Sequence, residues 1–205
     1  MQTLDLKQTL KPYFTAAVGK PALIELPALP YLKIDGSGNP NTAPEYAAAV
    51  QGLYSLAYTA KFMLKKRGEL DFNVMALQGL WWAEDMLAFL EGRKDDWRWT
   101  MMIVMPEILT QAHIEEARTL AAKKTDPAVL ARIRLEPYTE GLAAQVMHLG
   151  PYSAEAPTIA ALHAFIAAQG CERSGLHHEI YLGDPRRTAP EKLRTIIRQP
   201  CRRLA

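Results

Sequence analysis

The residues best suited to chemistry lie near the carboxyl end of the chain, in the stretch 177–182, which reads HHEIYL. Side chains alternate along a β-strand, so His177, Glu179 and Tyr181 would share one face and the intervening residues the other. Ile180 and its neighbours would pack on a core, which leaves a carboxylate and a phenol on the opposite face. The pattern fits two structures, a strand that lines a ligand pocket and a solvent-facing polar strand at a sheet edge.

The composition of the whole chain narrows the classes of protein. With 205 residues, 49% of them hydrophobic, the chain is long enough to build a globular core. The 24 basic and 22 acidic residues leave a net charge of +2, so no broad positive surface is expected. Arginines are dense only at positions 186, 187, 194, 198, 202 and 203. A solvated face accounts for them, and we expect no direct nucleic-acid partner.

Cysteines and apolar segments indicate the compartment. Cys171 and Cys201 are too few for a disulfide scaffold and lack metal-ligand spacing, which fits a reducing cytoplasm. No uninterrupted apolar run reaches membrane length, and the first residues show no basic segment followed by an apolar run. We therefore expect a cytoplasmic protein without a membrane partner.

The first half of the chain has the pattern of one long helix among strands. Thr42 and Glu45 have the spacing of a capping box and predict the start of a helix that ends at Gly68. The glycine turn before it lacks the third glycine and the Gly-Lys-Ser/Thr ending of a phosphate-binding loop. Strands are predicted at 22–27, 31–35, 72–83 and 97–105. Pro27 and Pro30 indicate a bend or a sheet edge between the first two strands.

The second half repeats this order after two connecting helices. One connecting helix is predicted over about 110–124, and a short one begins at Asp126, an N-cap residue that precedes a proline. A long helix is then predicted over about 153–169, ended by Gly170. Strands are predicted at 134–149, around Glu179 and at 193–199. Both halves thus run strand, helix, strand, strand, and both end in a residue followed by proline, at Pro106 and Pro200.

This repeated order predicts an α+β fold made of duplicated βαββ modules. The first repeat would span about 15–106, the connecting helices about 107–133 and the second repeat about 134–200, within a single domain over 1–205. A pseudo-twofold arrangement of the two modules would leave a ligand crevice between the halves.

Four tryptophans fall on the last two strands of the first half, at positions 81, 82, 97 and 99. Alternation sends Trp81 and Trp82 to opposite faces, so at most one of them lines a pocket while the other packs in a core or an interface. Trp99 shares a strand face with Met101 and Ile103. A single tryptophan packs in the core more often than it contacts a ligand, but four within nineteen positions favour at least one ligand contact.

The chain resembles a known family over roughly residues 15–200. The similarity is carried by the segments YLKIDGSGNPNTAPEY (31–46), LQGLWW (77–82), HLGPYS (148–153) and HHEIYLGDPRRTAPEKLRTIIRQP (177–200). These segments resemble the GyrI-like small-molecule-binding proteins, in the stand-alone branch without a helix-turn-helix. The chain departs from the pattern at Gln78, where a glutamate is expected, which leaves the role of a second carboxylate there in doubt.

The resemblance implies a duplicated βαββ fold whose ligands are bulky, planar and often cationic, with a carboxylate at the position of Glu179 on the pocket floor. Some stand-alone members are cyclopropanoid cyclopropyl hydrolases, which open the cyclopropane of yatakemycin-type DNA alkylators by water addition within an aromatic cage. On this basis Glu179 and Tyr181 are the candidate catalytic residues. The candidate ligand-binding residues are Trp81, Trp82, Trp99, Tyr138 and Tyr152.

The chemistry of those residues agrees with either catalysis or capture. Burial raises the pKa of a carboxylate such as Glu179, which can then pair with a cation or take a proton from water. In ring opening a dienone becomes a phenolate, and Tyr181, Tyr138 or Tyr152 could donate a hydrogen bond to it. A non-catalytic binder that sequesters aromatic or cationic drugs remains the alternative. Direct inhibition of gyrase is suggested only by the family's name.

Other kinds of site are not expected. His148, His163, His177 and His178 share no metal-ligand pattern on one element, and no Gly-x-Ser-x-Gly segment indicates a serine nucleophile. We expect no cofactor and no metal. The chain would act as a monomer or homodimer on a planar aromatic small molecule.

Overall fold

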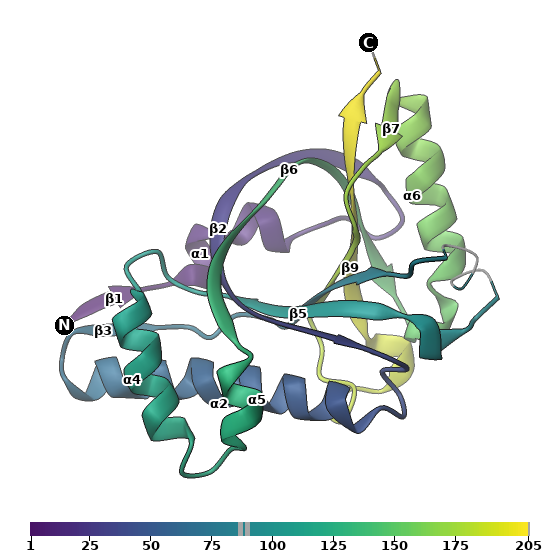
Figure 1. The fold of residues 1–205 in the computed structure, drawn as a ribbon. Helices are drawn as coiled ribbons and strands as arrows, with labels where there is room; N and C mark the ends of the chain where they lie inside the picture. The colour runs from purple at the N-terminus through teal and green to yellow at the C-terminus, as the bar shows by residue number, and fades with distance from the viewer. Residues whose placement is uncertain (86–87, 89–90, 205) are drawn as a thin grey trace. The chain divides into compact units, whose positions relative to one another are not determined.

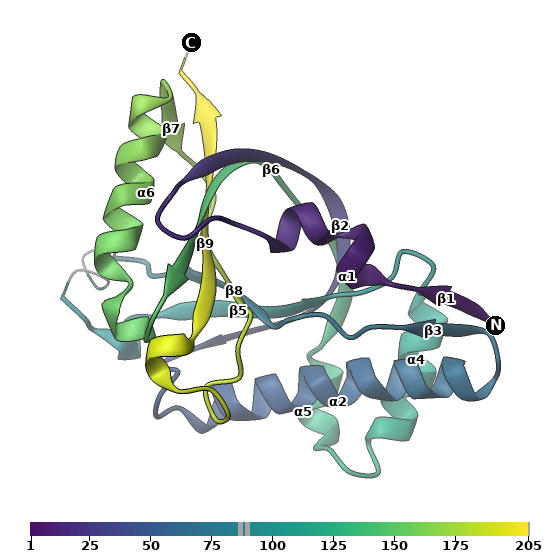
Figure 2. The ribbon, with the colours of Figure 1, turned by 180° about the vertical axis from the view of Figure 1, so that it is seen from behind.

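The fold mixes helices and strands, as the computed structural model shows for residues 1–85, 88 and 91–204 (Figures 1 and 2). The first half contains β1 (Gln2–Leu4), α1 (Leu6–Thr9), η1 (Lys11–Phe14), β2 (Ala22–Ser37), α2 (Pro44–Lys66), β3 (Leu70–Phe72), β4 (Gln78–Trp82), η2 (Lys94–Asp96) and β5 (Arg98–Val104). The second half contains α4 (Gln111–Ala121), α5 (Pro127–Ala131), β6 (Arg134–Leu149), η3 (Tyr152–Ala154), α6 (Ala156–Ala168), β7 (Cys171–Arg173), β8 (His177–Tyr181), η4 (Pro190–Lys192) and β9 (Arg194–Arg203). Among the described residues no helix is long and apolar enough to cross a membrane.

The two halves share their order of elements. Each runs through a long strand, a helix and three further strands, β2-α2-β3-β4-β5 and β6-α6-β7-β8-β9. The long strands have 16 residues each, the next strands 3 residues each and the third strands 5 residues each. The predicted order is therefore present with one additional short strand in each half.

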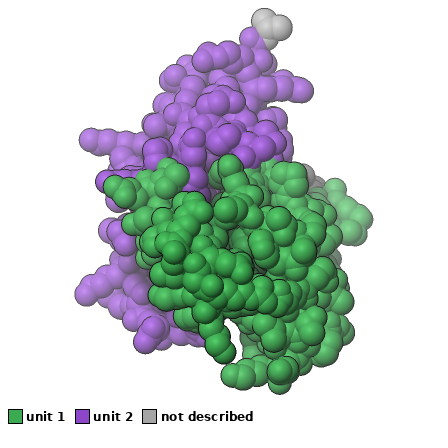
Figure 3. Space-filling view, turned by 90° about the vertical axis from the view of Figure 1, so that its left-hand side faces the viewer, with its two compact units in different colours: residues 1–9, 29–75, 81–138 green, residues 10–28, 76–80, 139–205 purple. Residues whose placement is uncertain are grey.

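The chain divides into two compact units, coloured separately in Figure 3. Unit 1 comprises residues 1–9, 29–75 and 81–138, and unit 2 comprises residues 10–28, 76–80 and 139–205. The strands β2, β4 and β6 contribute residues to both units.

In unit 1 the long helix α2 packs against α4, α5 and β3. Gly52 permits the approach of α5, because a Cβ at this position would lie 2.7 Å from Cγ1 of Val129. The antiparallel ladder between β2 and β5 runs from Tyr31 opposite Val104 to Ser37 opposite Arg98. β1 runs parallel to β3.

In unit 2 the strand β9 is the centre of the sheet, since it pairs antiparallel with β6, β7 and β8. Both views of the ribbon place α6 beside β7 and β9 (Figures 1 and 2). Leu162 and Ile166 of α6 bury against Val146 of β6 and Ile197 of β9. The opposite face of these strands holds a second cluster, which includes Ile180 and Ile196. The strands are thus apolar on both faces, and polar side chains among them require specific partners.

Three predicted boundaries are wrong. The predicted strands 22–27 and 31–35 form one continuous strand, because the ladder with β5 begins only at Tyr31 and needs no donor from Pro27 or Pro30. The predicted strand 72–83 is two strands, β3 and β4, and the interruption falls where the chain passes from unit 1 to unit 2.

The predicted end at Pro200 is also wrong, because β9 continues to Arg203. Before Pro200 the strand pairs with β6 and β8, and after it with β7. The proline marks the change of partner, where a missing N–H is tolerated.

The predicted capping box is absent. The N-cap of α2 is Ala43 without a side-chain cap, and Pro44 occupies the first turn, where a missing N–H leaves no donor unsatisfied. The end of the helix at Gly68, with φ of 69°, agrees with the prediction. The Asp126 cap of α5 is also confirmed, since its side chain accepts from the Ala128 N–H.

Candidate functional site

The carboxylate of Glu179 is held on β8 by its neighbours on the same strand face. Nε2 of His177 lies 3.0 Å from Oε1 of Glu179, and the Tyr181 hydroxyl donates to Oε2 at 2.8 Å. The expected sharing of a face by these three side chains is therefore confirmed. With its side chain 15% exposed, Glu179 is neither a solvated surface carboxylate nor fully enclosed.

The register of β8 with β9 and the cover of α6 explain why this face is a site. Glu179 is opposite Ile197 and Tyr181 is opposite Thr195, so these pairs share one face of the sheet. Ile197 packs under α6 in the apolar cluster of this face. The amino end of α6 and the preceding turn η3 therefore border the carboxylate, and Tyr152 of η3 packs edge-on against Tyr181 with ring centroids 5.6 Å apart.

A second carboxyl group, Glu155 at the start of α6, completes the site. Glu155 is only 4% exposed, and the negative charge of Glu179 acts on its pKa. No sequence motif singles out Glu155, although an acidic residue at the start of a helix that covers the sheet is a usable signal. Its electrostatic coupling to Glu179 joins positions far apart in the sequence and depends on the packing of α6 against β7 and β9.

The two carboxyl groups have opposite pKa shifts. Burial and the nearby charge of Glu179 raise the pKa of Glu155 to about 9. The expected rise in the pKa of Glu179 is wrong: burial acts to raise it, but His177 and Tyr181, which are within hydrogen-bond distance of the carboxylate, outweigh burial and place this pKa below its ordinary value. At neutral pH the pair therefore contains one carboxylic acid and one carboxylate.

The other face of β8 carries a buried polar network centred on His178. Nδ1 of His178 lies 2.7 Å from Oε1 of Glu140, whose Oε2 accepts from Nη1 of Arg198 at 3.0 Å. Arg198 also donates to Oε1 of Gln145 and to the carbonyl of Tyr13. Burial acts to raise the pKa of Glu140, but His178 and Arg198 outweigh burial and lower it, so Glu140 is an ionised partner. This network ties β8 to β6 and β9 behind the Glu179 carboxylate.

Gln78, the departure from the family pattern, belongs to this network. Its Oε1 lies 3.0 Å from Nε2 of His178, and its Nε2 has no hydrogen-bond partner among the described residues. A neutral imidazole that donates from Nδ1 to Glu140 has an acceptor at Nε2, which the Gln78 amide satisfies when its two ends are exchanged. The role of Gln78 is thus to hydrogen-bond with His178. The second carboxyl group near Glu179 belongs to Glu155.

The aromatic residues of unit 1 form a separate cluster of four rings. Tyr46 contacts Trp99 edge-on with centroids 5.3 Å apart and lies 6.0 Å from Trp81, which in turn contacts Trp97 at 5.8 Å. Trp99 is completely buried, and a Cβ on Gly36 would overlap its ring. Only a glycine at position 36 therefore leaves room for the Trp99 ring.

The remaining predicted site residues are divided between the two units. Trp82 is partly exposed at the end of β4, whereas Trp81 is buried. Tyr138, in unit 1, contacts Tyr31 edge-on and lies beneath the ammonium of Lys33. Tyr152, in unit 2, is the predicted aromatic residue adjacent to Glu179 and Tyr181.

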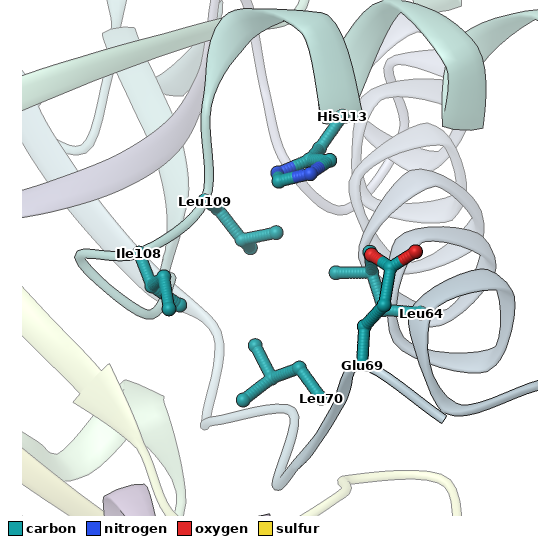
Figure 4. A pocket seen from close by; sticks show the side chains of 6 residues that line it. All are labelled: Leu64, Glu69, Leu70, Ile108, Leu109 and His113. Atoms are coloured by element: carbon teal, nitrogen blue, oxygen red, sulfur yellow. The ribbon is translucent and has the colours of Figure 1, made fainter. Parts of the chain in front are cut away.

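A hollow on unit 1 of about 70 Å³ is too small for a planar aromatic ligand, whose sites span about 300 to 1,000 Å³ (Figure 4). Its lining residues are Leu64, Glu69, Leu70, Ile108, Leu109 and His113. No group of three or more metal-ligating side chains occurs in the part of the chain that the structure describes. Cys171 and Cys201 are buried, unpaired thiols.

A mixed sheet and helix fold with a largely buried carboxylate beside two tyrosine rings is typical of a small-molecule-binding protein. The chain belongs to the GyrI-like family: the GyrI-like small molecule binding domain matches residues 19–202. The resemblance inferred from the sequence is thereby confirmed. No match is found among curated proteins.

Solved structures agree with this assignment. An uncharacterized conserved protein from Listeria innocua is 38% identical over 97% of this chain and 100% of its own, with a TM-score of 0.88. A protein from Listeria innocua described as a hydrolase is 37% identical over 97% of this chain and 100% of its own, with a TM-score of 0.84. The C-terminal domain of EcmrR shares the fold, at 11% identity over 90% of this chain and 98% of its own, with a TM-score of 0.56.

Proposed function

We propose that the protein binds planar aromatic small molecules beside Glu179 and hydrolyses cyclopropane-bearing alkylators by adding water. The observation that supports this most directly is the largely buried Glu179 carboxylate, oriented by His177 and Tyr181. Similarity to Listeria innocua proteins described as hydrolases supports catalysis. The reaction would protect a cell from an electrophilic toxin.

The proposed reaction needs a base, a nucleophile and a stabilised leaving group. Glu179 accepts a proton from water, whose oxygen forms a bond to the cyclopropane carbon. The cyclopropane C–C bond breaks, its electron pair moves through the ring system, and the dienone oxygen becomes a phenolate that takes up a proton. Because the pKa of Glu179 lies below its ordinary value, the carboxylate is present at neutral pH.

The tyrosines have different parts in this proposal. The Tyr181 hydroxyl donates to Glu179, so its role is to hold the base in place. Tyr152, 38% exposed and in contact with Tyr181, is the candidate donor to the developing phenolate. Tyr138 and the tryptophans Trp81, Trp82 and Trp99 would supply aromatic surface for a flat ligand.

A second candidate function is capture of cationic aromatic compounds without catalysis. The observation that favours it is the single negative charge of the carboxyl pair next to the rings of Tyr152 and Tyr181. A partly desolvated carboxylate and adjacent aromatic faces both attract a cation. Catalysis and capture use the same residues and differ only in whether water reacts.

The deciding experiment is incubation of the purified protein with a yatakemycin-type alkylator, followed by mass spectrometry. Hydrolysis produces a species heavier by one water, at a rate that depends on protein concentration. Glu179→Gln serves as the matched control, because it keeps the shape of the side chain and removes the base. Binding of the alkylator without a water adduct would favour capture, and neither binding nor product would reject both functions.

The duplication of the fold is also a proposal. It is supported by the matching order and lengths of the elements from β2 to β5 and from β6 to β9. Superposition of the two segments in an experimental structure tests it. Gln78 and Glu179 should then occupy equivalent strands.

A further inference from the structure

The long helix α2 keeps one side exposed, although it packs against α4, α5, β3 and β5. Five exposed residues recur along it at spacings of three, four or seven, so they lie on the same side of the helix. They are Ala47, Gln51, Tyr58, Phe62 and Lys65, and we call them the α2 stripe. The opposite side of α2 is buried in unit 1. The stripe is therefore a continuous surface along the length of the helix.

The carboxyl-terminal half of the α2 stripe is aromatic and open to solvent. Tyr58 is 44% exposed and Phe62 is 58% exposed. The ring of Tyr58 stacks between those of Tyr54 and Phe62, with centroid distances of 6.3 and 6.1 Å. The three rings form an ordered apolar ridge, because each ring restrains its neighbours. Large, ordered and exposed apolar side chains are typical of a contact between proteins.

The amino-terminal half of the α2 stripe carries smaller side chains. Its exposed residues are Ala47 and Gln51, and Ala48 beside them is partly exposed. Alanines along a helix surface leave a shallow groove into which the side chains of another helix can pack. One helix therefore presents an aromatic ridge at one end and a groove at the other.

A second copy of α2 in the antiparallel orientation matches the ridge to the groove at both ends. With a two-fold axis near Ser55, Phe62 of one chain lies level with Ala48 of the other. The aromatic ridge of each chain then packs on the small side chains of its partner. In a parallel pair the two ridges would face each other and the two grooves would remain empty.

Charges at the two ends of α2 favour the same orientation. Glu45 lies in the first turn and Lys65 in the last turn. Each has an ion-pair partner in its own chain, Arg132 and Asp71, yet their side chains remain 43% and 47% exposed. In the antiparallel pair Glu45 of one chain lies level with Lys65 of the other, and the helix dipoles oppose each other. A parallel pair would place like charges at the same level.

We propose that the protein forms a homodimer through the α2 stripe, with the two helices antiparallel about a two-fold axis near Ser55. Tyr58 and Phe62 of each chain contact Ala47 and Gln51 of the other. The same patch serves both subunits, so the contact closes at two copies. The inference goes beyond the proposed reaction and is independent of it, because none of these residues belongs to the carboxylate site on β8.

Sedimentation velocity tests the association. The mass of the wild type should rise from one chain to two between about 1 and about 200 µM, since a contact between two helices is small and binds weakly. Phe62→Glu and Tyr58→Glu should each raise Kd at least about tenfold, because a charge enters the apolar contact. Val18→Glu, at a residue outside the stripe that is also 58% exposed, is the matched control and should leave Kd unchanged. A single-chain mass at every concentration, or a dimer that both stripe variants retain, overturns the inference.

The orientation of the helices is tested by a distance between spin labels. Lys66→Cys places a nitroxide at the exposed end of α2, and the native Cys171 and Cys201 are buried. Double electron–electron resonance should give about 33 Å between the two labels, since each lies about eleven residues of 1.5 Å rise from the axis. A parallel pair would place them about 10 Å apart, and that distance overturns the antiparallel arrangement. Near-ultraviolet circular dichroism verifies that each variant is folded, and the wild-type masses decide the association if one is not.

Discussion

The third strands of the two halves, β4 and β8, have the same length but carry different kinds of side chain. β4 buries four of its five residues and ends in two tryptophans. In β8 burial alternates, so that His178 and Ile180 are fully enclosed while His177, Glu179 and Tyr181 retain some exposure. One strand contributes aromatic surface, and the other contributes a carboxylate with its hydrogen-bond partners.

The order of elements and the chemistry of the side chains are therefore separable in this protein. Matching elements recur along the chain, but the pair of carboxyl groups and the buried ion network both lie in unit 2. The tryptophan cluster lies in unit 1, where Gly36 makes room for Trp99. If the two strands divide the function in this way, substitutions on β8 and on β4 have different effects.

The largest effect is expected for Glu179→Gln. Loss of a general base should lower turnover of a cyclopropane-bearing alkylator by about 10² to 10⁴, while a neutral planar dye still binds. Steady-state kinetics and dye titration measure the two effects. Glu172→Gln, at an exposed ion pair on β7, is the control and should behave as wild type. A Glu179→Gln variant that matches the wild type in turnover and in the binding of charged dyes would remove Glu179 from the site.

A large loss of stability is expected for Arg198→Met. The substitution leaves the buried Glu140 carboxylate without its guanidinium partner, at a cost of about 3 to 5 kcal/mol in the free energy of unfolding. Urea denaturation measures this change. Arg202→Met, in an exposed pair on the same strand, should change it by less than about 1 kcal/mol. Equal losses of unfolding free energy in both variants would show that the buried network behind β8 stabilises the fold no more than an exposed ion pair.

A pH-dependent effect, smaller per pH unit, is expected from Glu155. Its folded-state pKa is raised to about 9, so the folded protein holds a proton that the unfolded chain releases at its lower pKa. This contribution is complete below the unfolded pKa of about 4.3 and is lost as pH rises toward 9, by up to about 1.4 kcal/mol per pH unit. Glu155→Gln should flatten that decline in denaturation curves recorded from pH 5 to 9. Parallel pH profiles for the two proteins would contradict the assignment.

The smallest effect is expected in tryptophan fluorescence. Binding of a planar aromatic ligand should change the emission if Trp99 and one of Trp81 and Trp82 line the ligand site. Because Trp99 and Trp81 are buried and Trp82 is partly exposed, Trp82→Phe should remove more of the change than Trp81→Phe. An unchanged spectrum at saturating ligand, with binding shown independently, would assign all three tryptophans to the core.

Local patterns were sufficient for much of the fold and for part of the site. Alternation along 177–181 predicted that His177, Glu179 and Tyr181 share a face, because the period of a strand is a property of the backbone. Gly68 and Asp126 were recognised as helix ends for the same reason: each satisfies backbone groups within a few residues. The strand boundaries predicted from Pro27, Pro30 and Pro200 are wrong. A proline ends a strand only where a neighbouring strand needs its missing N–H as a hydrogen-bond donor, and the sequence does not show which strand is the neighbour.

Residue types and short spacings are enough to indicate the family, the order of elements and the carboxylate on β8. Tertiary structure alone decided that Glu155 is coupled to Glu179, that Gln78 serves His178, and that Trp99 rests on Gly36. Each of these interactions joins segments distant in sequence, and no local propensity specifies it. The pKa shifts of Glu155 and Glu179 also depend on tertiary structure. Both shifts arise from burial and neighbouring groups, which are present only after α6 has packed on the sheet.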